Sequence, residues 1–128
     1  MRGKIKVLLV EDNIALRDMY ETRLLREGYD VETAADGKEA LSIAISEQPD
    51  LVLLDIMLPK ISGFDVLSAL KSTQGVSHIP VIILTVLDQE SNRVKGLVEG
   101  AEDYMIKSQD MPQDVIAKIK VVLAKYGK

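Results

Sequence analysis

Three acidic residues stand directly after two apolar runs of the chain. Asp55 follows the run 51–54, and Glu11 and Asp12 follow the run 7–10. A carboxylate at the end of a buried strand is costly unless a partner compensates its charge. Carboxylate oxygens are also the ligands that hard divalent cations prefer. The three acids therefore predict a cation site, with Mg²⁺ as the expected ion.

Two further polar side chains end other apolar runs. Thr85 follows the run 81–84, and Lys107 follows the segment 103–106. In an open α/β sheet, ligands bind outside the carboxyl ends of the strands, so these residues should converge with the three acids. Taken alone, an Asp after a strand is usually a turn or helix-cap residue, and a lone Lys is ordinarily a solvated surface charge. The prediction of a cation site therefore depends on the occurrence of all five polar residues at strand ends.

The strands that must position these residues are visible as short apolar segments. Continuous apolar runs predict central parallel strands covered on both faces, and more mixed runs predict edge strands. The central candidates are Ile5–Val10, Leu51–Leu54 and Val81–Leu84, and the edge candidates are Asp30–Ala35 and Asp103–Ile106.

Apolar residues recur at helical spacing in the segments between and after these strands. The predicted helices have stop signals at Gly28, Pro49, Gly75 and Gly100, and Pro112 fits the start of the last one. The result is five βα units with right-handed crossovers. We expect a single domain over residues 1–128, with a doubly wound five-stranded parallel sheet, helices on both faces and the flavodoxin-like strand order 2-1-3-4-5.

Composition excludes several other classes of protein. The chain has 128 residues, no cysteine and a net charge of −4, so neither a disulfide framework nor a thiolate metal site is available. The longest apolar run falls short of the roughly 20 residues that cross a bilayer. Basic residues are scattered rather than gathered in a stripe. We expect no membrane insertion, no direct nucleic-acid binding and a cytoplasmic location.

The ordered set of motifs resembles the response regulator receiver domain of two-component signalling, in particular its chemotaxis-regulator-like members. The similarity rests on Glu11-Asp12, on the segment from Asp55 to Gly63, on Leu84-Thr85 and on the segment from Tyr104 to Lys107. Each motif is weak alone, but the set at these spacings is specific. The resemblance covers the chain from Ile5 to about Lys125.

The resemblance implies a phosphoacceptor domain rather than a conventional enzyme. Asp55 would take a phosphoryl group from a phosphohistidine of a histidine kinase or phosphotransfer protein. Asp12, Asp55 and the Met57 carbonyl would ligate Mg²⁺, and Glu11 would act mainly through water. The domain would promote its own phosphorylation and dephosphorylation.

The resemblance also assigns the residues around the phosphoryl group. Lys107 would pair with one phosphoryl oxygen, and Thr85 would donate a hydrogen bond to another. Tyr104 would be the switch aromatic that turns inward as Thr85 moves, although an ordinary half-exposed strand tyrosine is the alternative. The switched surface would then bind a downstream effector protein or domain.

Three positions depart from the family pattern. Glu11 stands where Asp is more common, Val86 replaces a small residue, and Ser108 replaces the usual proline after Lys107. The family's Lys-Pro bond is usually cis. A cis bond before serine costs about 3 to 4 kcal/mol, so we expect a trans bond between Lys107 and Ser108.

Three rival interpretations stay open at this point. A phosphatase of the haloacid dehalogenase type would need a second Asp two residues after Asp55, where this chain has Met57. A flavodoxin-like cofactor protein would need a phosphate cradle where Glu11-Asp12-Asn13 would repel an anion. A receiver-like interaction module that no longer depends on phosphorylation would be expected to lack part of the site.

Overall fold

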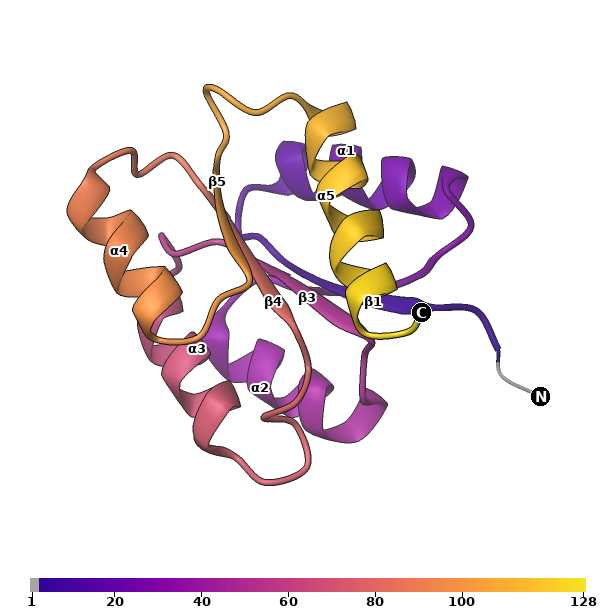
Figure 1. Ribbon diagram of the computed structural model, residues 1–128, viewed down its shortest axis with the longest axis horizontal. Helices are drawn as coiled ribbons and strands as arrows, with labels where there is room; N and C mark the ends of the chain where they lie inside the picture. The colour runs from indigo at the N-terminus through magenta and orange to yellow at the C-terminus, as the bar shows by residue number, and fades with distance from the viewer. Residues whose placement is uncertain (1–2) are drawn as a thin grey trace.

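Strands and helices alternate along the whole described chain. The computed structural model describes residues 3–128 (Figure 1). The elements in order are β1 Lys6–Val10, α1 Ile14–Arg26, β2 Asp30–Ala34, α2 Gly37–Glu47, β3 Leu51–Leu54, α3 Gly63–Ser72, β4 Val81–Thr85, α4 Glu90–Val98, β5 Asp103–Ile106 and α5 Pro112–Lys125. The predicted βα units are confirmed, and strand ends differ from the predicted ones by at most one residue.

The five strands form one parallel sheet in the order β2-β1-β3-β4-β5. This order confirms the flavodoxin-like prediction and leaves β2 and β5 at the edges. The central strands β3 and β4 are buried at every residue, whereas β2 and β5 also carry partly exposed residues. The contrast between continuous and mixed apolar runs therefore reflects how many faces and neighbours each strand has.

The helices cover the sheet in two layers (Figure 1). Because successive side chains of a strand point to opposite faces, Val7 and Leu9 of β1 join a core with α1 and α5. Leu8 and Val10 face the other way, into a core with α2 and α3. The helix α4 lies on this second side, where Gly96 packs against β4 and β5.

Local sequence signals start the helices that frame the site. The Asn13 side chain accepts a hydrogen bond from the Leu16 N–H at 2.9 Å and caps α1. Ser62 caps α3 by accepting from the Phe64 N–H at 3.1 Å. At Gly63 a Cβ would lie only 2.3 Å from the Asp55 carbonyl oxygen, so only glycine allows α3 to begin this close to β3.

The backbone tests the expectation for the peptide bond after Lys107. There is no cis peptide bond within residues 3–128, so the Lys107–Ser108 bond is trans, as predicted. Among those same residues, no helix is long and apolar enough to span a bilayer.

Candidate functional site

Backbone hydrogen bonds extend the sheet past its strand ends and hold the site residues at the carboxyl ends of the strands. The Glu11 N–H donates to Ala34 O at 3.0 Å, and the Asp55 N–H donates to Val10 O at 3.1 Å. The Lys107 N–H donates to Thr85 O at 2.8 Å. Each residue is therefore anchored to the neighbouring strand before its side chain makes any contact.

Lys107 joins two acids that lie far apart in sequence. Its ammonium lies 2.8 Å from Asp55 Oδ2 and 2.5 Å from Glu11 Oε1. The three side chains are almost fully buried, with exposed fractions of 11% for Lys107, 6% for Asp55 and 4% for Glu11. Because the pairs are screened only weakly by solvent, they hold the lysine in place more firmly than a surface ion pair would.

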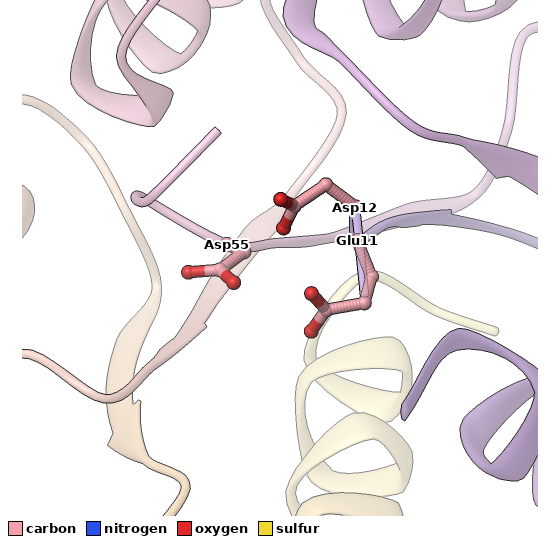
Figure 2. A group of neighbouring side chains, drawn as sticks. All are labelled: Glu11, Asp12 and Asp55. Carbon is pink, nitrogen blue, oxygen red and sulfur yellow. The ribbon is translucent and has the colours of Figure 1, made fainter. Parts of the chain in front are cut away.

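Asp12 completes a cluster of three carboxylates with Glu11 and Asp55, all within 4.8 Å of one another (Figure 2). Asp12 is exposed, whereas the other two are buried. One lysine against three carboxylates leaves a formal charge of −2, which a divalent cation would neutralise. The donor set is all oxygen, as Mg²⁺ requires. The residues thus fit Mg²⁺, and the cluster is exposed to solvent at Asp12.

Burial and pairing act against each other in this cluster. Burial raises the pKa of Glu11, and the hydrogen bond from Lys107 only partly offsets this effect. Burial by itself would lower the pKa of Lys107, but the carboxylates of Asp55 and Glu11 raise it overall. The two carboxylates thus favour the charged form of the lysine, whereas burial disfavours ionisation of Glu11, the acid nearest to it.

Met57 follows Asp55 by two residues, and Val86 directly follows Thr85 at the end of β4. The Met57 N–H donates to Asp55 Oδ1 at 3.1 Å, which fixes one carboxylate oxygen. The Met57 side chain is 52% exposed and Val86 is 54% exposed, so both present apolar surface to solvent.

Thr85 and Tyr104 are linked through the loop after β4. Thr85 is fully buried, and its Oγ1 lies 3.5 Å from the Leu87 N–H. The Tyr104 hydroxyl donates to the Leu87 carbonyl at 2.8 Å, and the residue is only 5% exposed. The tyrosine therefore points inward in this structure and is not a half-exposed strand residue.

Comparison with known proteins shows to which family this chain belongs. Residues 7–120 match the family described as the response regulator receiver domain. The chain belongs to this family. It is therefore a receiver domain of the two-component response regulators, and its flavodoxin-like fold is the fold of that family.

Several curated regulators are similar in sequence to this receiver domain. A probable transcriptional regulator ycf27 of Porphyridium aerugineum is 44% identical over 125 residues, which are 98% of this chain and 50% of the relative. The alkaline phosphatase synthesis transcriptional regulatory protein PhoP of Bacillus subtilis is 43% identical over 118 residues, which are 92% of this chain and 48% of the relative. The chain thus spans about half the length of these relatives.

Solved receiver domains have the same architecture. A CheY-like response regulator receiver domain protein from Methanospirillum hungatei superposes with a TM-score of 0.89 at 32% identity, and the match covers 96% of both chains. The BeF₃-activated N-terminal receiver domain of Klebsiella pneumoniae RstA gives a TM-score of 0.83 at 34% identity, over 92% of this chain and 97% of that one. Family membership disfavours the dehalogenase and flavodoxin interpretations.

Of the residues singled out in the sequence, the three acids and Lys107 lie close together at the carboxyl ends of the strands. Thr85 and Tyr104 are linked through Leu87. Two further loop residues, which the sequence did not single out, form hydrogen bonds beside them. The Asn13 N–H donates to Glu11 Oε2 at 3.1 Å, and the Asp110 carboxylate accepts from the Ile106 N–H at 2.7 Å. Both are loop residues of a type that commonly bonds nearby backbone. The sequence indicates this tendency, but it does not indicate which groups Asn13 and Asp110 bond to.

Proposed function

We propose that this receiver domain accepts a phosphoryl group on Asp55 from a phosphohistidine and that the modification changes its partner-binding surface. One observation supports this proposal above all. A buried carboxylate at the end of a central strand lies 2.8 Å from a lysine ammonium and within 4.8 Å of two more carboxylates. A carboxylate kept only for structural reasons does not need such an acidic neighbourhood.

The proposed reaction is an in-line displacement at phosphorus. An Asp55 carboxylate oxygen forms a bond to phosphorus as the phosphorus–nitrogen bond of the phosphohistidine breaks, and the imidazole leaves and takes up a proton. Phosphoryl transfer depends mainly on positioning and on neutralising charge. Asp55 is held for this step by the Met57 N–H on Oδ1 and by Lys107 on Oδ2.

The neighbouring residues have separate roles in this proposal. Lys107 neutralises charge that accumulates on the transferred group, because its ammonium already lies beside Asp55. Thr85 offers a hydroxyl at the end of the adjacent strand. Asp12, Asp55 and the Met57 carbonyl would hold Mg²⁺, with Glu11 acting through water, and the bound ion would supply charge neutralisation for the phosphoryl oxygens.

The partners of the domain follow from the same proposal. A histidine kinase or phosphotransfer protein would donate the phosphoryl group, and an effector protein or domain would respond to it. Two of the relatives are transcriptional regulators by name, and this chain matches about half of each. A transcriptional output is therefore the first hypothesis to test for the protein in which this domain acts.

The proposal is tested by incubating the protein with Mg²⁺ and acetyl phosphate and measuring its intact mass. We expect one added phosphoryl group in the wild type and none in Asp55→Asn. Excess chelator should abolish labelling of the wild type. Asp88→Asn is the matched control, because Asp88 is an exposed acid in the loop after β4. Undiminished labelling of Asp55→Asn, or labelling indifferent to chelator, would refute the proposal.

A further inference from the structure

The loop that follows Lys107 contains no residue that restricts its backbone. Residues 107–111 read Lys-Ser-Gln-Asp-Met, with neither proline nor glycine, and Pro112 only begins the next helix. Proline fixes φ by its ring, and no residue here does so. The direction in which the chain leaves β5 must therefore be set by hydrogen bonds.

Asp110 makes the hydrogen bonds that close this loop onto the end of β5. Its carboxylate accepts from the Ile106 N–H at 2.7 Å, and its own N–H donates to Ile106 O at 2.8 Å. The Gln109 N–H donates to the same carbonyl at 2.9 Å. Both backbone groups of Ile106 are thereby engaged by the loop that follows it.

These bonds lie on the side of β5 that no strand covers. β5 is the edge strand of the sheet, and the Lys107 N–H is bonded across to Thr85 O on β4. Since successive N–H groups of a strand point to opposite sides, the Ile106 N–H points away from β4. The Asp110 carboxylate supplies its hydrogen-bond partner. The backbone at Lys107 is thus held on one side by its hydrogen bond to Thr85 O of β4. On the other side it is held by the hydrogen bond between Ile106 and Asp110.

We propose that Asp110 is a positioning residue for Lys107: its carboxylate closes the 106–110 turn and so aims the lysine ammonium at Asp55 and Glu11. The role of Lys107 in phosphoryl transfer rests on the function proposed above, whereas its placement by Asp110 does not. Asp110 itself would touch neither Asp55 nor the phosphoryl group. Its effect would pass through the backbone of Lys107.

The variants Asp110→Ala and Asp110→Asn separate this role from a general loss of structure. Asparagine keeps a side-chain oxygen that can accept from the Ile106 N–H, and alanine does not. Because displacements of about 1 Å in a reacting site can cost about 100-fold in rate, we expect Asp110→Ala to slow labelling by acetyl phosphate about tenfold. Asp110→Asn should stay within about twofold of the wild type.

Asp114→Ala is the matched control. The Asp114 carboxylate also accepts a backbone N–H at the start of α5, from Met111 at 3.0 Å, but it makes no bond to β5. We expect this variant to lose stability and to be labelled at the wild-type rate. Equal slowing in Asp114→Ala and Asp110→Ala would mean that any weakening of the α5 start suffices, and would overturn the proposal.

A double-mutant comparison tests the path through Lys107. If Asp110 acts by aiming this lysine, Asp110→Ala should have no further effect on labelling in a Lys107→Ala background. Full additivity of the two substitutions would contradict the proposal, even if phosphorylation of Asp55 stood.

A readout without phosphorylation keeps the two proposals distinguishable. In Mg²⁺-free protein, NMR should resolve two inequivalent ε-methylene protons of Lys107 in the wild type and in Asp110→Asn, because the side chain is fixed. They should merge into one averaged signal in Asp110→Ala. If all three proteins give the same inequivalent pair, Asp110 does not position Lys107. Failure of the wild type to accept phosphate would refute only the proposed function.

Discussion

Lys107 compensates two buried carboxylates at once, and this explains how so acidic a site exists before any ion binds. Its ammonium lies within hydrogen-bonding distance of both Asp55 and Glu11. The pKa of Glu11 is nevertheless raised, first by burial and also by the charge of Asp55. A bound cation would relieve part of this repulsion. The site is thus arranged so that added positive charge is favourable there.

Val86 offers a test of what controls the lifetime of the proposed aspartyl phosphate. Val86 follows the end of β4 as Met57 follows the end of β3, and both residues are more than half exposed. An attacking water must approach phosphorus in line, and restricting its orientation slows hydrolysis. We expect Val86→Ala to shorten the lifetime about threefold in a direct decay assay.

The matched control for this prediction is Val98→Ala. Val98 is 79% exposed on α4, away from the strand ends that form the site. Its truncation should leave the decay rate unchanged. A lifetime that is unaltered or longer in Val86→Ala would show that crowding is not what limits hydrolysis.

The helix α4 packs closely against the sheet at a glycine. Gly96 is the one buried residue of this helix, and a Cβ there would lie 2.7 Å from Ile83 Cδ1 and 3.2 Å from the Tyr104 ring. Glycine within a helix ordinarily costs about 0.5 to 1 kcal/mol relative to alanine. The close approach to β4 and β5 explains why glycine is nonetheless suitable here.

We therefore expect Gly96→Ala to destabilise the domain rather than to stabilise it. Overpacking a core costs about 1 to 3 kcal/mol, which exceeds the gain in helix propensity. The free energy of unfolding from urea titrations measures the effect, with Ser91→Ala on the exposed part of α4 as control. A Gly96→Ala protein more stable than the wild type would show that α4 can move away without cost.

The end of α5 is joined to the start of β5 by Glu102. The carboxylate accepts a hydrogen bond from the Tyr126 hydroxyl and pairs with Lys125 at 3.0 Å. The Tyr126 bond, followed by that of Lys125, lowers the pKa of Glu102 below its usual value of 4.5. A depressed acid pKa stabilises the fold above the unfolded-state value, and this stabilisation is lost as the pH falls through the folded-state pKa.

Glu102→Gln should accordingly lower stability at pH 7 and lower it less at pH 3. Because the pair lies near the surface, the loss at pH 7 should stay below about 1 kcal/mol. Unfolding midpoints of both proteins at the two pH values measure it. An equal difference between the two proteins at pH 7 and pH 3 would show that the charge of Glu102 is not the cause.

For the molecule as a whole, the sequence was sufficient to predict the fold and the convergence of the three acids and Lys107 at the carboxyl ends of the strands. Apolar runs such as Leu51–Leu54 signal central strands by themselves, and parallel strands necessarily bring residues at their carboxyl ends together. The closeness of Gly96 to Tyr104, and the bond from Ile106 to Asp110, could not be predicted. They depend on distances between elements, and local propensity does not encode such distances.

Phosphorylation should affect the molecule unevenly. Thr85, Leu87 and Tyr104 form a connected path from the site towards α4 and β5, and an allosteric output requires an element of this kind with two arrangements. Beryllofluoride with Mg²⁺, standing in for the phosphoryl group, should shift NMR signals of residues 87–104 more than those of α2. Larger shifts in α2 would place the output on another face.

Trapping the acyl phosphate would show whether Asp55 is the phosphoacceptor. Borohydride reduces an aspartyl phosphate to homoserine, and peptide mass mapping then locates the converted residue. After incubation with acetyl phosphate and Mg²⁺, we expect homoserine at position 55 and at no other aspartate. Conversion at Asp12 or at another position, with Asp55 intact, would show that Asp55 is not the phosphoacceptor.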